Sequence, residues 1–264
     1  YVDDADGHVS ADYHSEDPTL EAIEKMTRSA QGWNDIINLT GGSLAYHKTK
    51  WQMIAWENTG HLKQLQQETK QTLLINDWTG TPTTITHGPT DEPNIGLGFH
   101  LCPNGTQTHQ FEHTLKSIQQ LCHNVTLANL SSQEALQTVT QRLTPKLHYP
   151  LHLTSFTHSQ SDKINTLIRR AFLPPMRLNR HLPSAVLYGP LSMGGMAFPE
   201  AYTMQDQAQI PYLLKQLRWD KTVANDILVT LDHIQLISGL TTPILHDTMP
   251  PIRYIDNSFL ISIR

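Results

Sequence analysis

Two adjacent carboxylates, Asp3 and Asp4, follow Tyr1 and Val2 at the start of the sequence. Successive residues of a strand point to opposite faces, so the chain must turn here for both acids to reach one site. Carboxylates that are held close together repel each other unless a cation lies near them. Mg²⁺ binds one or two carboxylates together with substrate phosphates, and two such ions support in-line nucleotidyl transfer. The alternative interpretation of the pair is a solvated turn.

A second candidate site is the pattern His109-x-x-Glu112-His113, which matches the H-x-x-E-H pattern of some zinc proteases. On a helix the two histidines share a face, with the glutamate beside them as a possible base. However, the chain has 15 histidines, so chance matches are frequent, and no third ligand is identifiable. Phe111, Leu115 and Ile118 also give this segment a packing role. A zinc metalloprotease therefore stays a remote alternative.

Four arginines form the third candidate site: Arg169, Arg170, Arg177 and Arg180 surround the apolar stretch Phe172-Leu-Pro-Pro175. The net charge of −5 excludes a strongly basic protein, but the charge is uneven along the chain. Residues 1–40 carry nine acids and two bases, a net charge of −7, whereas residues 141–221 carry ten bases and four acids, a net charge of +6. A basic stripe can follow phosphates, and a solvated cationic face is the alternative.

The elements that position these residues change in type along the chain. Asp17 can cap a helix that starts with Pro18, and Gly41-Gly42 can end it. Its apolar residues recur at three- and four-residue steps: Leu20, Ile23, Thr27, Ala30, Trp33 and Ile37. Short strands are expected between Leu44 and Trp56 and over 95–101, and residues 58–94 are expected to be rich in loops with one strand at 72–75.

After the Asn104-Gly105 turn signal, the apolar period becomes that of helices. The first stripe is Phe111, Leu115, Ile118 and Cys122, and the second is Ala135, Val139 and Leu143. The third is Ile164, Leu167, Ile168 and Phe172, ending at Pro174-Pro175, and the last is Val223, Ile227, Leu231 and Ile234. These patterns predict an α+β chain with a mixed part over 1–105 and a mostly helical part over 106–264. No stretch of 18 apolar residues is present, so no membrane partner is expected.

Several of these short motifs resemble, in the same order, the conserved motifs of reverse transcriptases. Tyr1-Val2-Asp3-Asp4 resembles motif C, the Tyr-x-Asp-Asp hairpin of the polymerase palm. The helix with Gly41-Gly42-Ser43-Leu44 and His47-Lys48-Thr49-Lys50-Trp51 resembles the stretch that leads into motif D. Ile95-Gly-Leu-Gly-Phe99 is similar to the primer grip of motif E. Tyr188-Gly-Pro190 and Gly194-Gly195, followed by Gln205, Gln207 and Gln209, resemble the region after the polymerase domain in non-LTR-type mobile elements.

The resemblance implies a partial polymerase palm over 1–105 and a helical, thumb-like region with an extension over 106–264. It implies an RNA-directed DNA polymerase of a retroelement, with an RNA template, a DNA primer and dNTPs as partners and an intracellular location, nuclear in a eukaryote. Asp3 and Asp4 would be catalytic and hold Mg²⁺ or Mn²⁺, and Lys48 would donate a proton to the leaving pyrophosphate. The template-primer contacts would be Tyr1, Val2, Leu97, Gly98, Arg169, Arg170, Arg177 and Arg180.

One departure from the family concerns motif A, whose aspartate would lie upstream of Tyr1. The sequence therefore predicts a fragment without the fingers and most of the palm, which is inactive as a polymerase by itself. A non-catalytic remnant that still binds nucleic acid is the alternative.

Overall fold

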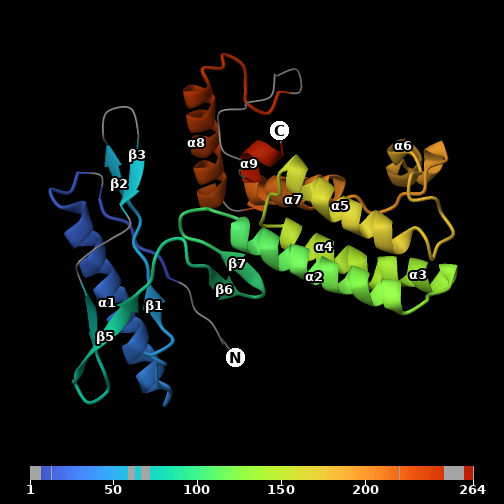
Figure 1. Ribbon diagram of the computed structural model, residues 1–264. Helices are drawn as coiled ribbons and strands as arrows, with labels where there is room; N and C mark the ends of the chain where they lie inside the picture. The colour runs from blue at the N-terminus through green and yellow to red at the C-terminus, as the bar shows by residue number, and fades with distance from the viewer. Residues whose placement is uncertain are drawn as a thin grey trace. The chain divides into compact units, whose positions relative to one another are not determined.

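A computed structural model describes residues 7–12, 14–58, 63–66, 72–219, 221–246 and 259–263 (Figure 1). The chain forms two compact units, Tyr1–Thr106 and Gln107–Arg264. The first unit combines one long helix with short strands, and the second consists of helices in its described part. The predicted α+β class is therefore confirmed. None of the helices in the described part of the chain is long and apolar enough to cross a membrane.

Helix α1 (Pro18–Leu39) begins and ends where the sequence predicts. The carboxylate of Asp17 accepts a hydrogen bond from the Leu20 amide at 3.0 Å, and Gly41 follows the helix with a φ of +81°. Ile23 is buried, with Met26 and Ala30 beside it. The predicted apolar face is wrong at two positions: Leu20 and Trp33 are each 44% exposed, whereas Asn34, next to Trp33, is fully buried.

A three-stranded sheet lies against α1 and has the order β1 (Lys50–Trp51), β5 (Pro82–His87) and β4 (Leu73–Asn76). The β1–β5 pair is parallel and the β4–β5 pair is antiparallel. Strand β4 confirms the predicted strand at 72–75, whereas the central strand β5 lies in a stretch that was expected to be loop. Its only apolar residue, Ile85, is buried with Leu73 and Ile75.

The described part of the first unit also contains two further antiparallel strand pairs. Strands β2 (Ala55–Asn58) and β3 (Lys63–Gln66) pair antiparallel, as do β6 (Asn94–Gly96) and β7 (Phe99–Leu101). The single strand predicted over 95–101 is therefore wrong. Leu97 and Gly98 form a two-residue turn with φ values of +51° and +82°, and positive φ at both positions is typical of a type I′ turn, which reverses the chain.

In the second unit the predicted helical stripes at 111–122, 164–172 and 223–234 are confirmed by α2 (Thr108–Leu127), α5 (His158–Phe172) and α8 (Lys221–Ser238). The stripe at 135–143 lies on α3 (Ser132–Thr138) and a π-helical turn (Val139–Leu143), which α4 (Thr144–Leu151) continues. The described part of this unit also contains α6 (Ser184–Tyr188), the 3₁₀ turn Leu191–Met193, α7 (Ala201–Trp219) and α9 (Phe259–Ser262).

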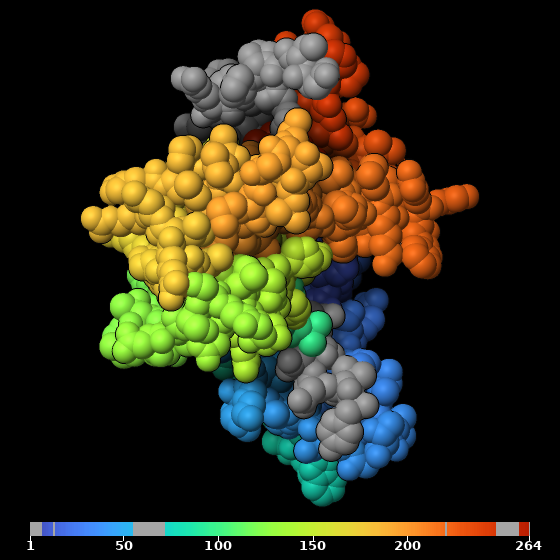
Figure 2. All heavy atoms as spheres, turned by 90° about the vertical axis from the view of Figure 1, so that its right-hand side faces the viewer, coloured from blue at the N-terminus to red at the C-terminus, as the bar shows by residue number. Residues whose placement is uncertain are grey.

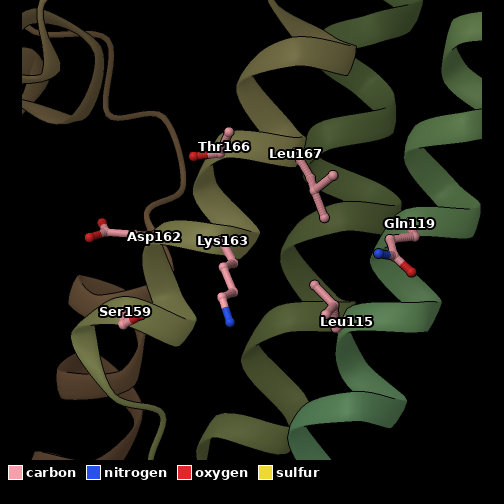
Figure 3. Close-up of a pocket in the computed structure, with 7 residues that line it drawn as sticks. All are labelled: Leu115, Gln119, Ser159, Asp162, Lys163, Thr166 and Leu167. Carbon is pink, nitrogen blue, oxygen red and sulfur yellow. The ribbon is translucent and has the colours of Figure 1, made fainter.

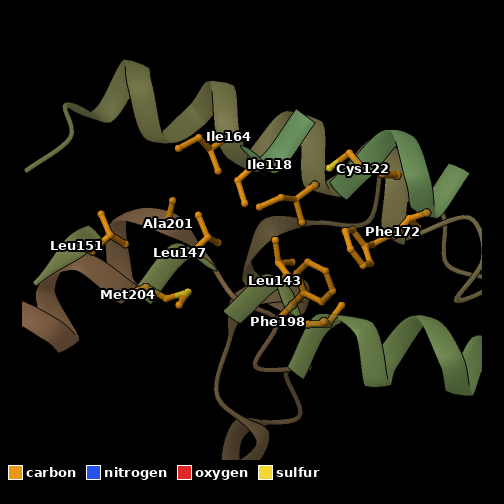
Figure 4. Close-up of a cluster of buried hydrophobic side chains, with 14 of the residues drawn as sticks. Ile118, Cys122, Leu143, Leu147, Leu151, Ile164, Phe172, Phe198, Ala201 and Met204 are labelled. Carbon is orange, nitrogen blue, oxygen red and sulfur yellow. The ribbon is translucent and has the colours of Figure 1, made fainter. Parts of the chain in front are cut away.

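The π-helical turn keeps one apolar row pointing at the core of the second unit. This row has a strict four-residue spacing, and each member is at most 3% exposed: Ala135, Val139, Leu143, Leu147 and Leu151. Four residues of an α-helix turn about 400°, so a row at this spacing drifts by about 40° per step. A turn closed by i→i+5 hydrogen bonds is wider and offsets that drift. Its three leucines, Leu143, Leu147 and Leu151, lie in one buried cluster with Ile118 and Ile164 (Figure 4).

Two buried glutamines of α7 bind the segment that joins α4 to α5. Gln209 Nε2 donates to the carbonyls of Leu151 and Thr154 at 3.1 and 3.0 Å. Gln205 Oε1 accepts from the Phe156 amide at 2.6 Å. This helix face therefore carries hydrogen bonds in place of an apolar stripe, which explains why apolar periodicity does not predict α7.

Candidate nucleic-acid interface

The longest stretch of the sequence without a carboxylate runs along α5 and the residues after it. Residues 163–199, which we call the basic segment, carry Lys163 and the four arginines but no carboxylate. The nearest carboxylates in the sequence are Asp162 and Glu200, directly outside it. In Figure 2 the gold atoms of this segment lie uncovered on the side of the molecule that faces the viewer. Four of these cations, Lys163, Arg170, Arg177 and Arg180, have exposed side chains.

Arg169 differs from the other three arginines because its half-buried guanidinium binds the protein itself. It donates to the Ser184 hydroxyl at 3.1 Å, to the Arg180 carbonyl at 3.3 Å and to the Leu182 carbonyl. Its guanidinium carbon also lies 5.8 Å from the centre of the Tyr188 ring. Arg169 thus fastens residues 180–188 to the end of α5.

The other three arginines, Arg170, Arg177 and Arg180, have exposed side chains. Arg177 also has an unusual backbone, with a φ of +59°. Its amide donates to the Pro174 carbonyl and the Leu178 amide donates to the Leu173 carbonyl, both at 2.9 Å. These are the two hydrogen bonds of a Schellman motif, in which glycine is the usual residue at this position. A left-handed arginine costs about 1 kcal/mol in backbone energy, so its side chain is a candidate for function.

The glycines of the Tyr188-Gly-Pro190 and Gly194-Gly195 motifs allow two backbone segments to touch. A Cβ atom at Gly195 would lie 2.1 Å from the Gly189 carbonyl oxygen, and one at Gly189 would lie 2.3 Å from the Ala185 carbonyl oxygen. Hydrogen bonds close the loop, from the Ala197 amide to the Gly189 carbonyl at 2.9 Å and from the Gly195 amide to the Pro190 carbonyl at 3.0 Å. In this structure these glycines therefore shape the end of the basic segment.

A shallow groove runs between α2 and α5, beside the start of the basic segment (Figure 3). Leu115 and Leu167 lie between the two helices, and Lys163 lies between them as well, while Asp162 points away from α2. The remaining lining side chains are the polar residues Gln119, Ser159 and Thr166. The groove can therefore offer hydrogen bonds and one cation to a ligand.

A cluster of titratable groups between α5 and α7 has no counterpart in the sequence predictions. The rings of His158 and Tyr202 stack with their centres 3.9 Å apart. Burial raises the pKa of Asp206, the Glu200 carboxylate raises it further, and His158 partly offsets both. Glu200 is itself engaged, since its carboxylate accepts a hydrogen bond from the Thr203 amide at 3.0 Å at the start of α7. Tyr202 and Asp206 are four residues apart on α7, but His158 belongs to α5, and no sequence spacing indicates that it meets them.

Burial also raises the pKa of Tyr188, while the Arg169 guanidinium beside it acts in the opposite direction. The carboxylates of Glu200 and Asp162 act on the Tyr188 pKa as well and raise it. Tyr188 therefore stays neutral as the packing partner of Arg169.

The expected catalytic residues Asp3 and Asp4 and the expected template-primer contacts Tyr1 and Val2 lie outside the described residues. Lys48 has an exposed side chain in the turn before β1, where its amide donates to the Ala45 carbonyl at 2.8 Å. Leu97 is 86% exposed, and with Gly98 it forms the β6–β7 turn described above. Among the predicted site residues that the structure describes, Arg169 and Arg180 contact each other through the hydrogen bond from the Arg169 guanidinium to the Arg180 carbonyl.

The H-x-x-E-H side chains His109, Glu112 and His113 are exposed along the first turns of α2. Within the part of the chain that the structure describes, no three histidine, cysteine, aspartate or glutamate side chains lie close enough to hold a metal ion. The two cysteines, Cys102 and Cys122, are buried free thiols, and burial raises the pKa of Cys122 to about 11. A thiol with so high a pKa is protonated at neutral pH and is a poor metal ligand or nucleophile.

The arrangement can therefore bind a polyanion through three exposed guanidinium groups on a segment that Arg169 and the glycine contacts hold in place. Comparison with models of protein families, with curated proteins and with solved structures finds no match to this chain.

Proposed function

We propose that this chain is part of an RNA-directed DNA polymerase of a mobile element and that its basic segment binds the template-primer duplex. The observation that carries the proposal is the run of 37 residues between Asp162 and Glu200 with five cations and no carboxylate. Arg170, Arg177 and Arg180 expose their side chains there. The order of the reverse-transcriptase-like motifs supports the choice of an RNA–DNA duplex over other polyanions.

Guanidinium groups suit this task because they stay charged and bind phosphate oxygens through two parallel hydrogen bonds. Contacts with the phosphate backbone position a protein on a duplex without reading its sequence. A polymerase that copies any template needs binding of this kind. Arg169 donates its hydrogen bonds within the protein and holds residues 180–184 in position.

The chemical step would depend on Asp3 and Asp4, which would hold Mg²⁺ or Mn²⁺, and on Lys48 as a proton donor. The two aspartates lie outside the described residues. Such ions would stabilise the charge of the phosphates during transfer. Lys48 is exposed to solvent in its turn, where a proton donor would be accessible to a bound substrate.

The proposal is tested by measuring the affinity of the chain for a fluorescent RNA–DNA duplex by anisotropy at several salt concentrations. We expect salt-sensitive binding that the double variant Arg170→Ala/Arg180→Ala weakens. The matched control is Lys221→Ala, which removes an exposed cation at the start of α8, outside the basic segment. Binding that is absent, independent of salt or weakened equally by the control would refute the proposal.

The second candidate is a non-catalytic nucleic-acid-binding remnant, which the same basic segment supports. The two candidates differ in the DNA upstream of the codon for Tyr1. An open frame that encodes fingers and a motif A aspartate supports the polymerase, and a stop or start codon there supports the remnant. No observation on the described residues supports a zinc metalloprotease.

A further inference from the structure

Two large apolar side chains stand out from the basic segment. Leu191 is 74% exposed and Met193 is 84% exposed, and both lie on the 3₁₀ turn between Pro190 and Gly194. We call this pair the apolar tip. Large apolar side chains at such exposure often mark a surface that contacts a partner when they adjoin one another.

The residues on both sides of the apolar tip are fixed in the core of the second unit. Leu187 before it is fully buried, and Phe198 after it is 6% exposed. The two flanks are joined by hydrogen bonds from the Met196 amide to the Val186 carbonyl at 2.9 Å and from the Phe198 amide to the Leu187 carbonyl at 3.0 Å. Because both flanks are anchored and the backbone at Gly195 lies close to the Gly189 carbonyl, Leu191 and Met193 lie on a loop of defined conformation.

The charges around the apolar tip indicate the chemistry of its partner. Every charged side chain within residues 163–199 is a cation. Tyr188, three residues before Leu191, packs under the guanidinium of Arg169, which also binds the carbonyl of Arg180. The apolar tip therefore extends from the same framework that presents the exposed arginines. A partner that complements both features has negative charge next to uncharged, apolar surface.

Nucleic acid has this combination, because its bases and sugars lie beside its phosphates. Proteins that bind duplexes through arginines also insert leucine or methionine side chains against base steps. We propose that Leu191 and Met193 pack against bases or sugars of the nucleic acid that the exposed arginines hold. This inference rests on the proposed function, since it concerns a second type of contact with the same ligand.

The experiment compares the wild-type chain with Leu191→Ser/Met193→Ser in binding an RNA–DNA duplex across a salt series. Binding falls as salt rises, so a plot of log K against log salt has a negative slope. Each lost phosphate contact makes this slope less negative by about 0.9, whereas apolar contacts release no counterions and leave it unchanged. We therefore expect the tip variant to bind about tenfold more weakly with an unchanged slope. Arg170→Ala should make the slope less negative. The matched control is Leu127→Ser/Leu236→Ser, at two side chains outside the basic segment that are 67% and 77% exposed, and it should bind like the wild type.

The outcomes separate this inference from the proposed function. If the wild type shows no salt-sensitive binding, both fail. If the wild type binds and the tip variant binds equally well, only the inference fails. A less negative slope in the tip variant would also refute the inference, because the substitutions would then weaken binding by displacing arginines from the phosphates. Light scattering covers one more case: if the wild type is a dimer that the tip variant converts to a monomer of unchanged affinity, the tip is a self-association surface and the inference is wrong.

Discussion

Arg169 and Arg170 are adjacent in sequence, yet we expect opposite consequences when each is replaced by alanine. The Arg169 guanidinium makes three hydrogen bonds, to the Ser184 hydroxyl and to the carbonyls of Arg180 and Leu182, and lies over the Tyr188 ring. Hydrogen bonds with a charged partner contribute about 1.5–3 kcal/mol each, but such contributions within one group do not add fully. Because the side chain is half-buried, we expect Arg169→Ala to lower the free energy of unfolding by about 2–4 kcal/mol.

Arg170→Ala is the matched control, because its side chain is exposed and a surface substitution of this kind changes stability by less than about 0.5 kcal/mol. The first assay is urea unfolding followed by far-ultraviolet circular dichroism, which monitors the helices of the second unit. The second is amide hydrogen exchange of residues 178–188, where protection should fall in Arg169→Ala alone. Equal unfolding midpoints for the two variants, or unchanged exchange in Arg169→Ala, would refute the assignment of Arg169 to structural support.

Three further substitutions test other parts of the account. Arg177→Gly should keep the urea midpoint or raise the unfolding free energy by up to about 1 kcal/mol, since glycine relieves the left-handed backbone, and a clear loss of stability would contradict this. Gly195→Ala should lower the free energy of unfolding by about 1–3 kcal/mol or more, because the alanine Cβ would collide with a backbone oxygen. A variant with the melting temperature of the wild type would show that the backbone contact is absent. Asp206 has a raised pKa in the folded chain, so its ionisation weakens stability as pH rises above the ordinary carboxyl range. Asp206→Asn should remove this decline in urea midpoints measured between pH 4 and 7, and an unchanged pH profile would contradict the assignment.

The elements that the sequence predicts correctly are those whose local signals agree with their packing. α1 has a capping aspartate, a proline at its first position and a glycine after its end, and its buried Ile23 falls on the predicted face. Helices α2, α5 and α8 are found because each carries apolar side chains at helical spacing on its core face. Here local propensity and burial point to the same structure.

The elements that the sequence does not predict depend on contacts made by residues distant in the chain or on rare backbone conformations. β5 has a single apolar residue, Ile85, and becomes a central strand only because β1 and β4 pair with its two edges. The β6–β7 turn places Leu97 at a positive φ, which leucine seldom adopts, so the stretch reads as one strand. α7 buries Gln205 and Gln209, whose hydrogen bonds to the α4–α5 segment cannot be inferred from periodicity.

The candidate site was predictable as a set of arginines but not in the separate roles of its members. The spacing of Arg169, Arg170, Arg177 and Arg180 suggests one basic surface. It does not reveal that Arg169 turns toward the protein, because its partners are backbone carbonyls that only the folded loop brings near. The left-handed conformation of Arg177 is equally a property of the helix end, where hydrogen bonds from 177 and 178 close the turn.

The salt dependence of duplex binding by Arg177→Gly tests the central claim most directly, because this variant removes one exposed cation without an expected loss of stability. Affinity for an RNA–DNA duplex is measured at several salt concentrations for this variant and for the wild type. We predict weaker binding and a slope of log K against log salt that is smaller by about 0.9, as for the loss of one phosphate contact. A stable variant with the affinity and slope of the wild type would contradict the assignment of the basic segment as the nucleic-acid interface.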